Sequence, residues 1–283
     1  MGYSCFDVEV ADKVAHVRLS RPDELNTMNR AFWVELPAVV RELDGRGDVR
    51  ALVLSSTGRH FTAGMDLSVF TSGDALGGDG GGDAGEIGRV RARLRQTALM
   101  LQDSFTAFEK ARFPVLVAVQ GGCIGGGVDL VCAADMRYAT DDAFFVVQEI
   151  NIGMTADVGT LQRLPRLVPE GVARELAYTG RRMAASRAAE VGLVNEVFAD
   201  HETMVAGVLD IAGEIAVKSP LAVWGTKQTL NYSRDHTIAD GLEYIATWQT
   251  GMFQPADMME AFAAKAEGRA PEFPDLLPSP DDF

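Results

Sequence analysis

The sequence lacks most features of secreted, membrane-spanning or nucleic-acid-binding proteins. Its three cysteines, Cys5, Cys123 and Cys132, are too few and too scattered for a disulfide framework, so we expect each to be a small buried side chain. No apolar run approaches the ~18 residues of a membrane span. Lys and Arg number 26 against 40 Asp and Glu, which leaves a net charge of −14. Because broad phosphate-backbone binding needs a basic surface, we expect no nucleic acid and no membrane as partners.

Several functional motifs are also missing. Four scattered histidines form no metal-ligand pattern, and neither a GxxxxGK[ST] phosphate loop nor a GxSxG nucleophile elbow occurs. A GxGxxG match at Gly80, Gly82 and Gly85 lies inside the glycine-rich segment 72–85 with no strand before it, which indicates chance rather than a dinucleotide site. The N-terminal MGYSCFDVEV has no apolar signal core and the C-terminal PDDF no peroxisomal tripeptide, so we expect a cytoplasmic protein.

An alternation of strand and helix patterns is present instead. Strands are expected at 6–10, 14–20, 50–56 and 114–119, and helices at 27–43, 87–110 and from residue 128 onward. Residues 61–67 and 72–85 are expected to be loops, the second one mobile. From Gly159 the chain is mostly helical. The alternation predicts an α/β fold with a largely parallel sheet, and the Pro- and Asp-rich end is expected to lie loosely on the surface.

The stretch AVQGGCIGGGVDLVCAAD (118–135) places a pair and a triplet of glycines between a predicted strand and a predicted helix. Free N–H groups at a helix start, together with the helix dipole, favour negative charge. Glycine would let a ligand atom approach the backbone because it has no Cβ. A tight turn that packs the strand against the helix explains these glycines as well, and the spacing alone leaves both interpretations open.

Five blocks of sequence carry a resemblance to a known family. They are RPDELNTMN (21–29), FTAGMDL (61–67), PVLVAVQGGCIGGGVDLVCAADMRYA (114–139), FFVVQEINIGMTADVGTLQRLPRLV (144–168) and EAFAAKAEGR (260–269). In this order and at these intervals they resemble the enoyl-CoA hydratase/isomerase, or crotonase, superfamily. The resemblance implies a spiral of ββα units over residues 1–200, a helical trimerisation region over 201–270 and a tail over 271–283. It also implies a homo-oligomer, either a trimer or a dimer of trimers.

The same resemblance implies an acyl-CoA thioester substrate and an oxyanion hole. The hole's two backbone N–H groups map onto Met65 and Gly126, where they would hold the thioester oxygen as it becomes an enolate. Losing one such donor typically costs roughly 3–4 kcal/mol of transition-state stabilisation. The residues that the resemblance assigns to CoA binding are Leu25, Asn26, Thr62, Ala63, Phe262 and Lys265, the last two toward a neighbouring subunit. For these two, an amphipathic packing face with a solvated lysine is an equal alternative.

Three carboxylates at matching intervals refine the resemblance. Asp129, Glu149 twenty residues later and Asp157 eight further on resemble the set in Δ3,5-Δ2,4-dienoyl-CoA isomerases, as do GGCIGGGVDL and YSRDH. In the hydratases two glutamates stand at the first two positions, and Asp129 is shorter by roughly 1.5 Å. Moving a diene from positions 3,5 to 2,4 takes a proton from C2 and adds one at C6, about 5 Å away. Two acids, one ionised and one protonated, can serve both carbons.

The expected roles follow from that reaction. Glu149 and Asp157 shuttle the proton, with Glu149 favoured at C2 although the reverse stays open, and Asp129 orients or tunes them. Moving protons and double bonds needs no metal or redox cofactor. Each acid also has a simpler interpretation: Asp157 as a helix cap, Asp129 as a solvated residue early in its helix, and Glu149 as the partner of an arginine. The alternative function is an enoyl-CoA hydratase or another acyl-CoA isomerase of the superfamily.

Overall fold

The computed structural model describes residues 2–66, 68–69 and 87–280 of the 283-residue chain. The strands are β1 (Phe6–Ala11), β2 (Val14–Leu19), β3 (Ala51–Ser56), β4 (Val115–Val119), β5 (Gly122–Ile124), β6 (Met136–Thr140), β7 (Phe144–Val146), β8 (Met183–Ala184) and β9 (Glu196–Phe198). The helices are α1 (Arg30–Arg46), α3 (Ile87–Lys110), α4 (Gly126–Ala133), α5 (Thr160–Leu167), α6 (Glu170–Thr179), α7 (Ala185–Glu190), α8 (His201–Ala216), α9 (Pro220–Asp235), α10 (Ile238–Met252) and α11 (Pro255–Glu267). A short 3-10 helix, η3, covers Glu149–Ile152.

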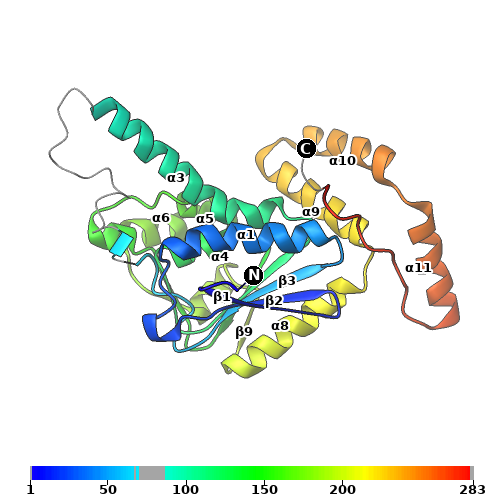
Figure 1. The fold of residues 1–283 in the computed structure, drawn as a ribbon, viewed down its shortest axis with the longest axis horizontal. Helices are drawn as coiled ribbons and strands as arrows, with labels where there is room; N and C mark the ends of the chain where they lie inside the picture. The colour runs from blue at the N-terminus through cyan, green and yellow to red at the C-terminus, as the bar shows by residue number, and fades with distance from the viewer. Residues whose placement is uncertain (1, 67, 70–86, 281–283) are drawn as a thin grey trace.

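The main sheet has six strands in the order β1-β2-β3-β4-β6-β9. The β1–β2 pair is antiparallel and every other pair is parallel. The central strands β3 and β4 are buried along their whole length, which explains their nearly unbroken apolar runs. Helix α8 packs on one face of the sheet, and α1 and α3 lie on the other (Figure 1). The α/β prediction with a largely parallel sheet is confirmed.

A second, smaller sheet of β5, β7 and β8 stands beside the main one. Its first strand lies inside the glycine-rich stretch, where the sequence analysis predicts no strand. β5 pairs in parallel with β7 from Gly122 opposite Phe144 to Ile124 opposite Val146. Local propensity misses this strand because glycine is a poor strand former. The pairing places the glycine-rich stretch at the junction of the two sheets.

The observed start and end of α1 differ from the predicted ones because capping residues set them. Helix α1 begins at Arg30 rather than Thr27, because the Asn29 side chain accepts a hydrogen bond from the Phe32 N–H as an N-cap. It ends at Arg46, before Gly47 at a φ of 80°. Helix α3 spans the predicted residues 87–110. The predicted loop at 72–85, with its GxGxxG match, lies outside the residues that the structure describes.

The C-terminal tail is held in place, so the expectation of a loose tail is wrong. After α11 the chain returns to the main body, where the guanidinium of buried Arg50 binds Asp275 at 2.8 Å and also the Phe273 carbonyl. Arg112 donates to the Leu277 carbonyl at 3.0 Å. The proline and aspartate content indicated a solvated tail, but these arginine contacts join segments more than 160 residues apart.

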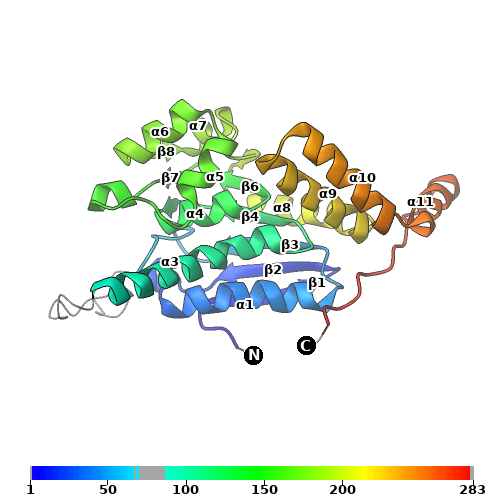
Figure 2. The same ribbon diagram turned by 90° about the horizontal axis from the view of Figure 1, so that it is seen from above.

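Helices α9, α10 and α11 extend from one end of the body (Figures 1 and 2). In both views α11 lies far from α4 and α5. No described helix is long and apolar enough to cross a membrane.

Candidate active site

Two backbone segments run side by side at the junction of the sheets. Thr62 N–H donates to the Gly122 carbonyl at 3.1 Å, and Ile124 N–H donates to the Thr62 carbonyl at 3.2 Å. A Cβ on Gly64 would lie 2.7 Å from the Ile124 carbonyl oxygen, so only glycine permits this approach. The next residues in the two segments include Met65 and Gly126, the positions predicted to supply the oxyanion hole.

Helix α4 begins at this point. Gly125 precedes it at a φ of 54°, and Gly126 is its first residue. The first N–H groups of a helix have no partner inside the helix, and the dipole adds partial positive charge there. Beneath Gly126, a Cβ would meet the Met28 sulfur at 2.9 Å and the Trp33 ring at 4.0 Å. The side of Gly126 on which a Cβ would stand is therefore closely packed.

Glu149 stands beside this helix start, in the first turn of η3. A Cβ on Gly125 would lie 3.3 Å from Glu149 Oε1. Its Oε2 is buried without a hydrogen-bond partner among the described residues, and no described arginine or lysine forms an ion pair with it. Burial, and next the negative charge of Asp129, raise the pKa of Glu149 to about 7. The alternative that Glu149 is the partner of an arginine is therefore wrong.

Asp129 is wholly buried in α4. Its Oδ1 accepts a hydrogen bond of 2.6 Å from the Thr160 N–H, the first residue of α5, and its Oδ2 has no partner among the described residues. Burial raises the pKa of Asp129 to about 6, while the Thr160 N–H acts in the opposite direction. The alternative of a solvated Asp129 is wrong, because its side chain caps a different helix from inside the core.

Asp157 lies in the connection between η3 and α5, with its side chain exposed. The N-cap of α5 is Gly159, and no side chain caps that helix end from the N-cap position. Asp157 therefore does not act as the predicted helix cap, a role that Asp129 takes instead. Partial burial raises the pKa of Asp157, and its charge in turn raises those of Glu149 and Asp129. The three carboxylates thus form one electrostatic group.

Four of the residues predicted to bind CoA lie together beside this site, and two do not. The Asn26 side chain donates to the Thr57 and His60 carbonyls and is almost fully buried. Thr62 Oγ1 donates to the Asn26 carbonyl and accepts the Gly64 N–H. These side chains shape the loop. The residues left with exposed or half-exposed surface there are Leu25 and Ala63.

Phe262 and Lys265 are exposed on α11, at the far end of the molecule (Figure 2). Within one chain they do not meet the carboxylates. Their assignment to a neighbouring subunit's CoA stays a prediction.

Sequence reasoning missed two side chains behind the site. Gln102, on α3, donates to the Asp157 carbonyl, and Arg163, on α5, reaches the Val158 carbonyl. No local motif marks them, since the first lies 55 residues from its partner. Among the residues that the structure describes, no group of three or more His, Cys, Asp or Glu side chains is arranged to hold a metal ion.

Comparison with known proteins places this geometry in a family. The family model described as Enoyl-CoA hydratase/isomerase matches residues 9–276. The chain belongs to this family. A mitochondrial Delta(3,5)-Delta(2,4)-dienoyl-CoA isomerase of Homo sapiens is 44% identical over 269 residues, covering 94% of this chain and 80% of that protein. A peroxisomal protein of the same activity from Arabidopsis thaliana is 41% identical over 263 residues, covering 93% of both.

The fold agrees with solved structures of the family. A putative enoyl-CoA hydratase from Streptomyces coelicolor A3(2) superposes with a TM-score of 0.85 at 30% sequence identity, over 96% of this chain and 95% of that one. The resemblance to the crotonase superfamily, and within it to the dienoyl-CoA isomerases, is confirmed. The protein is an enzyme of the isomerase class.

The same comparison corrects one prediction. The human and Arabidopsis relatives are named as mitochondrial and peroxisomal, so the expectation of a cytoplasmic protein is wrong. The expectation rested on the absence of an apolar signal core and of a peroxisomal tripeptide, and these are only two of the addresses by which receptors sort proteins among compartments.

Proposed function

We propose that this protein converts 3,5-dienoyl-CoA thioesters into 2,4-dienoyl-CoA thioesters in fatty-acid β-oxidation. One observation carries the proposal: Glu149 stands beside the start of α4, burial raises the pKa of Glu149, Asp129 and Asp157, and the charge of Asp157 acts in the same direction on the other two. With the pKa of Glu149 at about 7, one acid of the group stays protonated while another is ionised near neutral pH. Moving a proton from C2 to C6 requires one ionised carboxylate to accept a proton and one protonated carboxyl to donate one. The names of the relatives support the same reaction.

In the proposed reaction, a carboxylate removes a proton from C2 and the electron pair moves onto the thioester oxygen. The N–H groups of Met65 and Gly126 stabilise that oxygen as its charge develops. The negative charge is delocalised along the diene to C6, where a protonated carboxyl adds a proton. The double bonds then stand at 2,4, and no atom is gained or lost. The balance requires neither a metal ion nor a redox cofactor.

We assign Glu149 to C2 and Asp157 to C6. The position of Glu149 supports its assignment to C2, because its carboxylate lies beside Gly125, one residue before the proposed oxyanion donor. The position of Asp157 supports its assignment to C6, because it lies on a separate connection and is partly open to solvent. Asp129 is the tuning group, since its charge raises the pKa of Glu149.

The buried position of Asp129 favours isomerisation over hydration. A hydratase would use this position and Glu149 to hold one water between two carboxylates. Here Oδ1 of Asp129 is already bound to the Thr160 N–H at 2.6 Å inside the core. Its shorter side chain also leaves the carboxylate drawn back from Glu149 by roughly 1.5 Å relative to a glutamate.

The proposal includes binding and assembly. Leu25 and Ala63, over the loop that Asn26 and Thr62 shape, would contact CoA, as would Phe262 and Lys265 from a neighbouring subunit. An apolar groove runs between α9, α10 and α11 and is lined by Leu221, Trp248, Met252, Phe253, Met258 and Phe273. Exposed apolar surface of this kind on three helices supports a trimer or a dimer of trimers.

Two substrates test the function. With a 3,5-dienoyl-CoA we expect a strong rise in near-ultraviolet absorbance, as a diene conjugated to the thioester forms. With a simple trans-2-enoyl-CoA we expect little loss of absorbance, because hydration would remove the conjugated double bond. Asp157→Asn keeps the shape but cannot exchange a proton, and should slow isomerisation by at least about 100-fold. Robust hydration together with an unaffected Asp157→Asn variant would make the protein a hydratase.

A further inference from the structure

The segment that carries Asp157 is held from behind by two side chains. Gln102 Nε2, on α3, donates to the Asp157 carbonyl at 2.7 Å. Arg163, on α5, reaches the Val158 carbonyl at 3.5 Å. A cavity of about 340 Å³ opens behind this segment, and its lining includes Gln102, Thr106, Glu109, Val158, Gln162 and Arg163. The carbonyls of Asp157 and Val158 are therefore held by side chains of α3 and α5.

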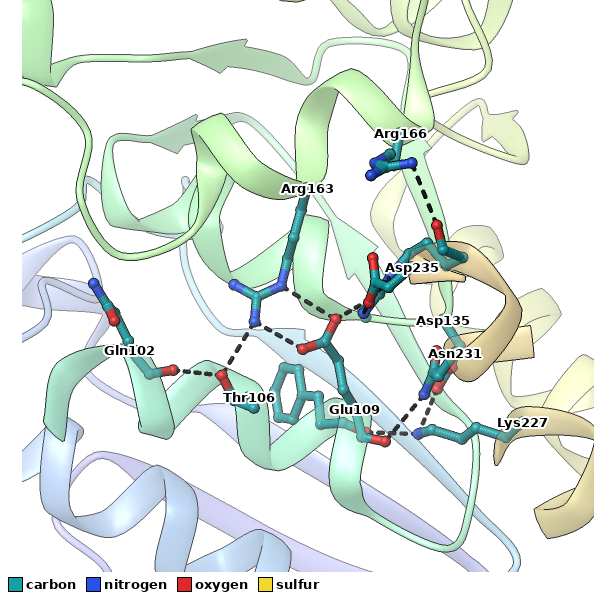
Figure 3. A network of polar contacts seen from close by, with 12 residues as sticks. Gln102, Thr106, Glu109, Asp135, Arg163, Arg166, Lys227, Asn231 and Asp235 are labelled. Carbon is teal, nitrogen blue, oxygen red and sulfur yellow. Dashed lines mark hydrogen bonds and ion pairs between the residues drawn. The ribbon is translucent and has the colours of Figure 1, made fainter. Parts of the chain in front are cut away.

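Arg163 is itself fixed in direction. Its guanidinium binds Glu109 through two contacts, at 2.8 and 3.3 Å, and donates to Thr106 Oγ1 at 3.1 Å. Figure 3 shows the guanidinium between these two residues of α3. Both side chains of the ion pair are at most 15% exposed. A bidentate pair of this kind sets both the place and the plane of the guanidinium.

A glycine at position 159 leaves space for the Arg163 guanidinium next to the backbone. Gly159 lies between Asp157 and α5 at a φ of 135°, and a Cβ there would overlap Nη1 of Arg163. Any other residue would be strained at this φ, and its Cβ would displace the Arg163 guanidinium. The turn that follows Asp157 is thus built around the guanidinium.

The charges around Glu109 hold it ionised. Burial acts to raise the pKa of Glu109, but hydrogen bonds and charge from Arg163 and Arg234 outweigh burial and keep the pKa below its usual value. Arg234, from α9, binds Glu109 at 2.7 Å. Asn231 of the same helix donates to the Glu109 carbonyl at 3.2 Å (Figure 3). Helix α9 is thereby bound to the end of α3 that holds Arg163.

We propose that Gln102 and Arg163 are positioning residues for Asp157, with Glu109 holding Arg163 in place. The inference rests on the proposed function and extends it. None of the three touches the substrate in this account; they act by fixing the connection from which Asp157 reaches C6. Because Glu149 stands on η3 and not on this connection, the positioning serves one end of the proton transfer only.

The first test replaces Gln102 by leucine, which keeps the bulk and removes the donor. Its matched control is Gln162→Leu, because Gln162 lines the same cavity and only its backbone N–H, which the substitution keeps, bonds to this segment, at the Gly159 carbonyl. We expect Gln102→Leu to lower kcat at least about tenfold with KM within about twofold of the control, since misplacing a reacting group costs turnover rather than binding.

Isotope exchange separates positioning from a general loss of structure. In D2O, removal and return of a proton at C2 labels unreacted substrate, while transfer to C6 forms product. If Gln102 positions Asp157 alone, Gln102→Leu raises the ratio of labelled substrate to product by at least about tenfold. A loosened fold would lower both rates together and leave the ratio unchanged.

A second variant acts through the ion pair. Glu109→Gln weakens the hold on Arg163 and is compared with Asp103→Asn, which breaks an exposed ion pair with Lys110 on the same helix. We expect Glu109→Gln to shift the exchange ratio in the same direction as Gln102→Leu, and Asp103→Asn to leave it unchanged.

The outcomes separate this inference from the function on which it rests. If the wild-type enzyme does not form a 2,4-diene, the proposed function fails. If wild type and Gln162→Leu form it, and Gln102→Leu and Glu109→Gln match them in kcat and exchange ratio, only the positioning role is refuted.

Discussion

Replacing Glu149 by glutamine should abolish turnover and should raise the stability of the protein relative to wild type as the pH becomes alkaline. Burial, and then the charge of Asp129, raise the pKa of Glu149 from an ordinary 4.5 to about 7. A carboxyl whose pKa is raised by folding is neutral in the folded state up to about pH 7, whereas the unfolded chain ionises it near pH 4.5. Its contribution to stability is therefore fully present below pH 4.5 and is lost as the pH rises through 7. At alkaline pH the difference amounts to about 3 kcal/mol.

Glutamine has no charge to bury, so it removes this pH-dependent cost. It also introduces a buried amide, whose unmet hydrogen bonds cost roughly 1–3 kcal/mol at any pH. This cost is the same at every pH, so it cancels when the relative free energy of unfolding at one pH is subtracted from that at another. From the same pKa values, the free energy of unfolding of Glu149→Gln relative to wild type should increase by about 2–3 kcal/mol between about pH 5 and about pH 8.5.

Urea unfolding at the two pH values measures this difference. Wild type and variant are compared at one protein concentration, because the stability of an oligomer depends on concentration. Glu214→Gln, at an exposed glutamate of α8, is the control and should give the same relative stability at both pH values. An equal effect of Glu149→Gln at both pH values, or a loss that grows with pH, would show that the carboxylate is not held in an unfavourable environment.

Three further outcomes are expected. Gly126→Val adds a Cβ 2.9 Å from the Met28 sulfur and so displaces the start of α4, which carries the proposed oxyanion donor; turnover of a 3,5-dienoyl-CoA should fall at least about 100-fold while circular dichroism stays native, and near-wild-type turnover would place the hole elsewhere. Lys227→Met leaves the partly buried Asp135 without its 2.8 Å partner and should cost about 3 kcal/mol in urea unfolding. Light scattering at micromolar protein should give a trimer or hexamer, and a monomer would contradict the assembly.

Much of the fold was predictable because its signals are local. The apolar runs of β3 and β4 and the amphipathic pattern of α3 each depend on neighbours within one element, so their bounds were found within a residue or two. The strand β5 was not found, because it is only three residues long, begins at Gly122 among flanking glycines of low strand propensity, and pairs only where β7 supplies an edge. The docking of the tail was missed for a related reason, since Arg50 meets Asp275 only in the folded chain.

The sequence by itself determined which acids are available and at which intervals, since Asp129, Glu149 and Asp157 and the two glycine-bearing loops are covalent facts of the chain. Only the tertiary structure decided what each acid does. It buried Asp129 and turned its carboxylate onto the first N–H of α5, and it left Asp157 exposed with its carbonyl bound by Gln102. Burial and hydrogen-bond partners set the pKa and direction of a carboxylate. Both depend on side chains that lie far away in sequence, and no local pattern records them.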